Sequence, residues 1–136
     1  MSYDWMSPQE AAAAELALKD MTKEEKIKFL EDLELKEARH QLMVARTDPI
    51  EFAKRVYPGF KVGPHHKKLA KILQDVLDGK KKRVIINIAP RMGKSEFSSY
   101  LFPAFFLGRY PEKKIIMGTH TASLSEDFGR RVRNLI

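Results

Sequence analysis

The chain has 136 residues, a length that is enough for one domain. It contains no cysteine, which excludes a disulfide framework and a thiolate metal site. No stretch approaches the roughly 18 consecutive apolar residues of a membrane span, and the N-terminus lacks the basic start and apolar run of a secretory signal. We therefore expect an intracellular protein with no membrane partner.

The charge of the chain is unevenly distributed. Residues 1–48 contain 7 Lys/Arg and 11 Asp/Glu, a net charge of −4, whereas residues 49–136 contain 18 and 7, a net charge of +11. A strongly basic section favours a polyanionic partner or a phosphate ligand. The alternative is a solvated surface with lysine-rich loops, and charge alone does not separate the two.

Two helices are predicted in the acidic section. Ser7-Pro8-Gln9-Glu10 combines an N-cap, a proline at the first helical position and a capping-box glutamate, and an alanine-rich run follows it. Thr22-Lys23-Glu24-Glu25 begins a second helix, which we expect to end near Arg46. Its predicted buried stripe consists of Ile27, Leu30, Ala38, Leu42 and Ala45. Residues 1–47 therefore form a helical N-terminal section, to which no chemistry is assigned.

Two further helices are predicted before the basic connector of residues 80–83. Asp48-Pro49-Ile50-Glu51 is a third capping signal and begins a short helix that ends near Val56. Pro64 begins the next helix, and Gly79 lies where a C-terminal cap is expected.

The next segment has the pattern of an α/β unit. Val84–Ile88 and Lys114–Gly118 are short, apolar and rich in β-branched residues, as buried strands are. Between them we expect a helix from Ser95 to about Phe106, kinked or ended by Pro103. A last helix, capped by Ser123 or Ser125, follows. Strand, helix and strand in this order predict a right-handed parallel crossover, so residues 48–136 are assigned to an α/β fold.

The loop between the first strand and its helix carries the most specific motif. A phosphate-binding loop reads G-x-x-x-x-G-K-[ST] between a strand and a helix. Gly93-Lys94-Ser95 match its end, whereas Ile88 occupies the position of its first glycine. The tripeptide alone is compatible with an ordinary turn. Its context, after an apolar strand and before a helix, favours nucleotide binding.

The chemistry of this loop predicts ATP and Mg²⁺ as ligands. Backbone N–H groups at a helix N-terminus attract phosphate, and Gly93 allows close approach of the backbone. Lys94 would reach the β- and γ-phosphate oxygens, and the Ser95 hydroxyl would ligate Mg²⁺. Arg91 adds a cation near the γ-phosphate. The predicted nucleotide-binding residues in the loop are Ala89, Pro90, Arg91, Met92, Gly93, Lys94 and Ser95.

Ile86–Glu96 resembles the variant Walker A motif of the large terminase subunits of tailed bacteriophages, P-P-R-x-G-K-S-E, with Ala89 in place of the first proline. Three other segments are similar to this family, so that the resemblance covers residues 47–136. They are Phe60–Leu69 with His65 and His66, Phe102–Arg109, and Thr119–Phe128 with Arg130, Arg131 and Arg133.

The resemblance implies a RecA-like P-loop ATPase core and the ATP-binding part of a DNA-packaging motor. It implies that Arg91 stabilises the γ-phosphate, so that Lys94 and Arg91 are catalytic, and that His66 contacts the adenine. The alternative for His66 is a surface histidine. The resemblance also implies that the protein acts in the host cytoplasm. The partners that it implies are double-stranded DNA, the portal protein, the small terminase subunit and further copies of the chain in a ring.

Two parts of such a motor are not found in the sequence. No apolar strand is predicted to end in the acidic Walker B pair, since Glu126-Asp127 lies in a predicted helix. The carboxylates of a C-terminal nuclease are also missing. We therefore expect a fragment truncated before Walker B, whose parent protein is an ATPase with a downstream endonuclease. Whether the fragment itself is an enzyme is left open.

Two other functions remain compatible with the sequence. One is a helicase-like P-loop translocase, and the other is a non-catalytic basic protein that binds DNA or protein and carries a decayed loop. The cluster Arg130, Arg131 and Arg133 either contacts DNA or a neighbouring subunit or forms the polar face of a helix. Asn87 and Glu96 are interpreted as structural.

Overall fold

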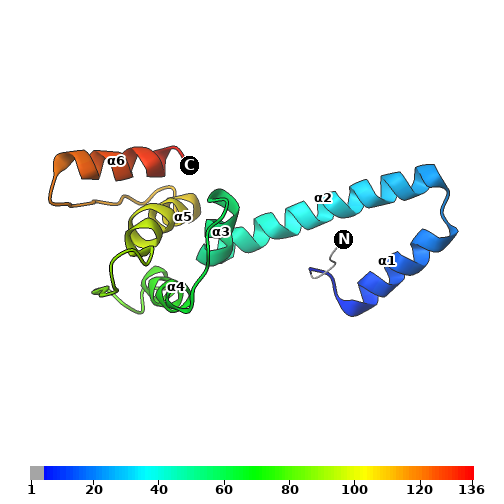
Figure 1. Cartoon of the computed structure of the whole chain (residues 1–136), viewed down its shortest axis with the longest axis horizontal. Helices are drawn as coiled ribbons and strands as arrows, with labels where there is room; N and C mark the ends of the chain where they lie inside the picture. The colour runs from blue at the N-terminus through cyan, green and yellow to red at the C-terminus, as the bar shows by residue number, and fades with distance from the viewer. Residues whose placement is uncertain (1–4) are drawn as a thin grey trace. The chain divides into compact units, whose positions relative to one another are not determined.

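The computed structural model describes residues 5–136, of which 67% are helical (Figure 1). The described chain divides into two compact units, one ending at Met43 and one running from Val44 to Ile136. The helices are α1 (Pro8–Asp20), α2 (Lys23–Thr47), α3 (Pro49–Val56), α4 (Pro64–Leu77), the π-helical segment η1 (Glu96–Leu101), α5 (Phe102–Arg109) and α6 (Ala122–Arg133).

The first unit contains α1 and most of α2, and both helices begin at predicted capping boxes. The Ser7 N–H donates to Glu10 Oε2 over 2.9 Å, and the Thr22 N–H donates to Glu25 Oε2 over 2.8 Å. Of the predicted buried stripe of α2, Ala45 is buried, whereas Ile27, Ala38 and Leu42 are exposed. Leu33, which was not in the predicted stripe, is buried. Helical periodicity identified an apolar stripe but not the side of the helix that is buried.

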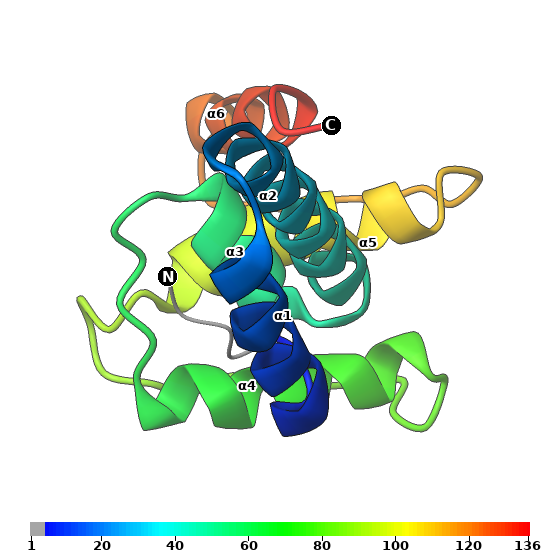
Figure 2. The ribbon, with the colours of Figure 1, turned by 90° about the vertical axis from the view of Figure 1, so that its right-hand side faces the viewer.

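The second unit is built around an apolar core that joins α3 and α4 to the helix η1–α5. Its most deeply buried members are Ala53, Phe97 and Leu101, and Ile50, Leu69, Ala70 and Leu73 complete it. The α3 helix begins as predicted at Asp48, whose carboxylate Oδ1 accepts the Ile50 N–H over 2.7 Å. In both ribbon views, η1 and α5 run between α4 and α6 (Figures 1 and 2).

The predicted α/β fold is wrong, because none of the residues that the structure describes belongs to a strand. The expected strands at residues 84–88 and 114–118 are irregular segments. Ile85 is 95% exposed and Ile116 is 98% exposed, although both were expected to be buried. An apolar, β-branched run forms a strand only when a neighbouring segment satisfies its backbone N–H and C=O groups. No described residue supplies that pairing here, so there is no parallel sheet or RecA-like core.

The helix that follows the loop is longer than predicted. It is continuous from Lys94 to Arg109 and contains η1, which ends two residues before Pro103. The Phe102 N–H donates to the Phe97 carbonyl, five residues earlier, as in a π-helix. Proline lacks the N–H that an α-helical ladder requires. The chain therefore widens by one π-turn before Pro103, and the helix does not end there.

Candidate functional site

The predicted loop is an exposed turn that leads directly into a helix. Arg91 has φ +63° and Gly93 has φ +70°, so two residues of the turn adopt left-handed backbone conformations. Helical structure begins at Lys94, and the Phe97 N–H donates to the Gly93 carbonyl over 2.9 Å. Left-handed backbone is uncommon for a residue with a side chain, as at Arg91, and such conformations are concentrated at ligand-binding sites.

This junction has the chemistry of an anion site. The first amides of a helix have no carbonyl partner within the helix, and the helix dipole adds partial positive charge there. Gly93 precedes the helix and has no side chain that could cap these amides. Arg91 and Lys94 add two cations on the same turn. Phosphate and carboxylate groups are bound at helix N-termini through this combination.

Lys94 lies back along the loop. Its ammonium Nζ is 3.5 Å from the carbonyl oxygen of Ile88, a distance at the outer limit of a hydrogen bond. The backbone at Lys94 is held by Ser98, whose hydroxyl donates to the Lys94 carbonyl over 2.7 Å. The start of the helix is thus fixed, whereas the ammonium group makes one weak contact that a phosphate oxygen can replace.

Gly93 is required for two independent reasons. Its φ of +70° is costly for any residue with a side chain. A Cβ at this position would also lie 2.8 Å from Nε2 of His66. The imidazole therefore packs directly against the glycine of the loop.

His66 is buried beneath the loop, with 5% of its surface exposed, so it is not a surface histidine. Its Nδ1 accepts the Gly63 N–H over 3.0 Å, and this acceptor role places the proton on Nε2. Within the described structure, Nε2 has no hydrogen-bond partner. Burial, and secondarily the neighbouring His65, lowers the pKa of His66, so the ring is neutral at pH 7.

Aromatic rings pack against the His66 ring, which in turn contacts the loop. The Phe60 ring lies 4.9 Å from the His66 ring and 6.0 Å from the Phe97 ring, centroid to centroid. His65 Nε2 is 3.0 Å from the carbonyl oxygen of Met92. These contacts connect the first turn of α4 to the loop, over 27 residues of sequence in the case of His65 and Met92.

A hollow of about 440 Å³ opens beside the loop. Of the predicted site residues, it brings together His66, Arg91, Met92 and Gly93. Ala89, Pro90, Lys94 and Ser95 are adjacent in sequence but do not line it. Other residues that line the hollow were not predicted to belong to a site. Glu96 was interpreted as structural, and no role was assigned to Tyr57 or Phe60.

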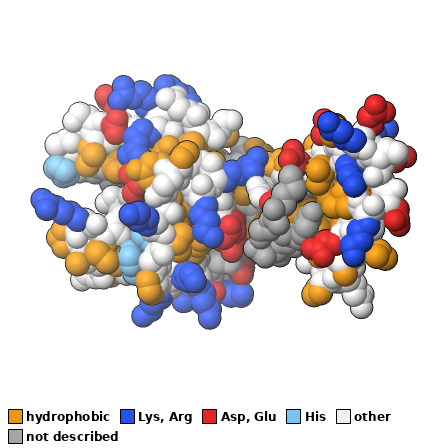
Figure 3. Space-filling view, turned by 45° about the vertical axis from the view of Figure 1, so that its right-hand side comes forward, with side chains coloured by type: hydrophobic (Ala, Val, Ile, Leu, Met, Phe, Trp, Pro, Cys, Tyr) orange, Lys and Arg blue, Asp and Glu red, His pale blue; other side chains and the backbone are white. Residues whose placement is uncertain are grey.

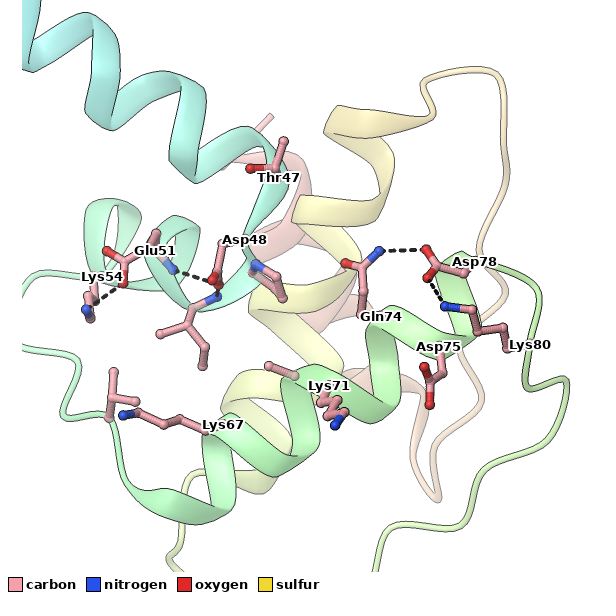
Figure 4. A pocket seen from close by; sticks show the side chains of 14 residues that line it. Thr47, Asp48, Glu51, Lys54, Lys67, Lys71, Gln74, Asp75, Asp78 and Lys80 are labelled. Carbon is pink, nitrogen blue, oxygen red and sulfur yellow. Dashed lines mark hydrogen bonds and ion pairs between the residues drawn. The ribbon is translucent and has the colours of Figure 1, made fainter. Parts of the chain in front are cut away.

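A larger hollow, of about 750 Å³, lies between α3 and α4 (Figure 4). Two of the lysines that line it are ion-paired with acidic side chains, Lys54 with Glu51 and Lys80 with Asp78, and the lining carboxylate of Asp75 is paired with Lys81. Lys67 and Lys71 also line it, together with the capping residue Asp48. Because its charges are largely balanced, this hollow has a weaker preference for an anion than the loop has.

The arginine cluster on α6 is divided between two environments. Arg130 pairs with Asp127 on the same helix over 2.7 Å and is largely exposed. Arg131 instead reaches the carboxylate of Glu96 and lies over the ring of Tyr100, 4.0 Å from its centroid. Arg133 is exposed. Arg131 is thus engaged within the protein, and Arg130 and Arg133 are the exposed members of the cluster.

No known protein family, curated protein or solved structure matches the chain. Among residues 5–136, no group of three or more His, Asp or Glu side chains is arranged to hold a metal ion. None of the helices in that range combines the length and apolar composition needed to cross a membrane. The geometry of the loop is therefore the basis on which a function is proposed.

Proposed function

We propose that residues 89–95 bind the terminal phosphates of ATP together with Mg²⁺. The observation that carries the proposal is the pair of left-handed residues, Arg91 and Gly93, directly before the helix that begins at Lys94. This turn places free amides, the positive end of a helix and two cationic side chains at one exposed point. A polyphosphate is the ligand whose charge and oxygen atoms use all of these groups.

Each residue has a specific role in this proposal. Lys94 exchanges its weak contact with the Ile88 carbonyl for the β- and γ-phosphate oxygens, and Ser95 ligates Mg²⁺. Arg91 binds the γ-phosphate through its planar guanidinium group. His66 donates from Nε2 to the adenine. Because that nitrogen is covered by Gly93, the donation requires the loop to shift when nucleotide binds.

We further propose that the chain is the ATP-binding part of a phage terminase large subunit. The support is the sequence resemblance of residues 47–136 and the net charge of +11 over residues 49–136, which suits contact with the phosphates of double-stranded DNA. Lys and Arg side chains are prominent on the face of the second unit seen in Figure 3. The portal protein, the small terminase subunit and further copies in a ring are the proposed partners, in the host cytoplasm.

A second candidate is a non-catalytic basic protein that binds DNA. One observation favours it: the described residues contain no strand, so no acidic strand end lies beside the loop to activate water. Under this candidate, the chain binds duplex DNA in a salt-dependent manner and does not bind nucleotide.

Thermal stabilisation by nucleotide distinguishes the two candidates. We expect Mg-ATP at 100 times its Kd to stabilise the wild type by about 2.7 kcal/mol. Lys94→Ala should abolish this shift, whereas Lys113→Ala, which removes an equal charge from an exposed site outside the loop, should retain it. Equal shifts in the wild type and Lys94→Ala, or no shift in either, would contradict the proposal.

A further inference from the structure

Glu96 places a carboxylate beside the proposed phosphate site. It follows Ser95 directly, begins η1 and lines the same hollow as Arg91 and Gly93. Its side chain is 26% exposed. An acidic residue in the first turn of a helix interacts favourably with the positive end of the helix dipole. Glu96 and a bound phosphate would therefore compete for the same positive potential.

Arg131 satisfies this carboxylate from another helix. Its guanidinium NH2 group forms an ion pair with Glu96 Oε1, across 35 residues of sequence. The same guanidinium lies 4.0 Å from the centroid of the Tyr100 ring and 5.9 Å from that of Phe128. The cation–π contact with Tyr100 helps to hold the guanidinium group in place, and the hydrogen bond to Glu96 raises the pKa of Arg131.

Arg130 shows that this arrangement is specific to one arginine. The two residues are neighbours on α6, but the Arg130 side chain is 65% exposed and pairs with Asp127 three residues earlier. The Arg131 side chain is 34% exposed and turns towards η1. One arginine thus forms a local surface pair, and its neighbour joins α6 to the helix that begins at the loop.

We infer that Arg131 is a positioning residue of the loop, which holds and neutralises the Glu96 carboxylate so that a bound polyphosphate does not face an unpaired negative charge. This inference rests on the proposed function. Unpaired, the carboxylate would repel the phosphate groups over a short distance in a partly buried site, where screening by salt is weak. Arg131 touches no ligand in this role and acts through Glu96.

A double-mutant cycle with Mg-ATP as the titrant tests the inference, with Kd measured by calorimetry. Arg131→Met keeps an apolar side chain against Tyr100 but leaves Glu96 unpaired, and we expect it to weaken binding about tenfold. Glu96→Gln should bind within about threefold of the wild type. The double variant should also return to within about threefold, because it contains no unpaired carboxylate. A purely structural role of Arg131 would not be rescued by removing a second charge.

Two controls separate this charge effect from other causes. Arg130→Met removes the same charge from the same helix and should leave Kd unchanged. Arg131→Lys retains the charge and should bind Mg-ATP as the wild type does, provided that far-ultraviolet circular dichroism shows it folded. If Arg131→Met unfolds, Arg131→Gln, which also removes the charge, replaces it. A tenfold loss in folded Arg131→Lys, wild-type affinity in Arg131→Met or no rescue in the double variant would overturn the inference. Absence of Mg-ATP binding by the wild type would instead overturn the proposed function, and this inference with it.

Discussion

The helices of this protein begin in two different ways. Ser7, Thr22 and Asp48 each lie at a helix start where the first amides and a polar side chain satisfy one another. The helix at Lys94 begins after Gly93, which has no side chain, and after a turn with two left-handed residues. The first kind of start is closed to a ligand by its own side chain, whereas the second leaves its amides available.

An uncapped start alone does not mark a binding site, because α4 begins after Gly63 and α6 after Thr121 without a side-chain capping bond. Basic side chains are spread over the second unit, and several are paired with nearby carboxylates, as around the hollow between α3 and α4. At the loop, cations coincide with uncapped amides and a strained backbone. Convergence of all three is expected where an anion binds, because each alone also occurs at ordinary surfaces.

Among the substitutions that test this comparison of helix starts, Gly93→Ala is expected to have the largest effect on stability. The left-handed conformation costs about 1 kcal/mol for alanine, and the contact of its Cβ with His66 adds about 1–3 kcal/mol. We therefore expect a loss of about 2–4 kcal/mol in the free energy of unfolding, measured by urea denaturation. A stable Gly93→Ala protein would show that the loop adopts another conformation in solution.

Gly108→Ala is the matched control for this substitution. Gly108 lies inside α5, and a Cβ there would meet no atom within 4 Å. Alanine is favoured over glycine in a helix by about 1 kcal/mol, so this variant should be as stable as the wild type or more stable. Destabilisation by both substitutions would point to a general intolerance of change in this helix.

A smaller effect is expected at a helix start that is closed by its own side chains. Thr22→Ala removes the hydroxyl that donates to Glu25 Oε2 over 2.8 Å, and should destabilise α2 by about 1 kcal/mol. Hydrogen exchange of the first amides of α2 measures this loss. Thr121→Ala is the control, because Thr121 precedes α6 without a side-chain capping bond, and we expect a change below about 0.5 kcal/mol there. Equal losses at the two sites would remove the distinction between closed and open helix starts.

Local signals in the sequence predicted most of the helices but not the fold class. Capping residues and Gly79 located the starts or ends of α1 to α4, because these signals act within one helical turn. The apolar segments at 84–88 and 114–118 were misassigned because a strand depends on a partner that its own residues do not specify. The actual cap of α6, Thr121, was also missed in favour of Ser123 or Ser125.

The candidate site was also predictable where it depends on local sequence and not where it depends on distant segments. The loop was located from Gly93-Lys94-Ser95, since a short motif is visible in sequence. The packing of His66 against Gly93 and the pairing of Glu96 with Arg131 were not predicted, because each joins segments far apart in the chain. Neither pair has a local pattern, so only the tertiary structure reveals that the loop is supported from α4 and from α6.

The smallest expected effect is a pH dependence that originates beneath the loop. Burial lowers the pKa of His66 from its ordinary value of 6.5, so below that pH the unfolded chain binds a proton that the folded chain does not. The stability that His66 contributes is therefore complete above the unfolded pKa and is lost as pH falls towards the folded pKa. His66→Asn keeps a short polar acceptor and removes the titration. Urea unfolding between about pH 7.5 and 5.5 should show a steeper loss for the wild type than for this variant. The other three histidines are present in both proteins, so parallel curves would mean that the His66 ring is exposed in solution and that the close packing of Gly93 on His66 does not persist there.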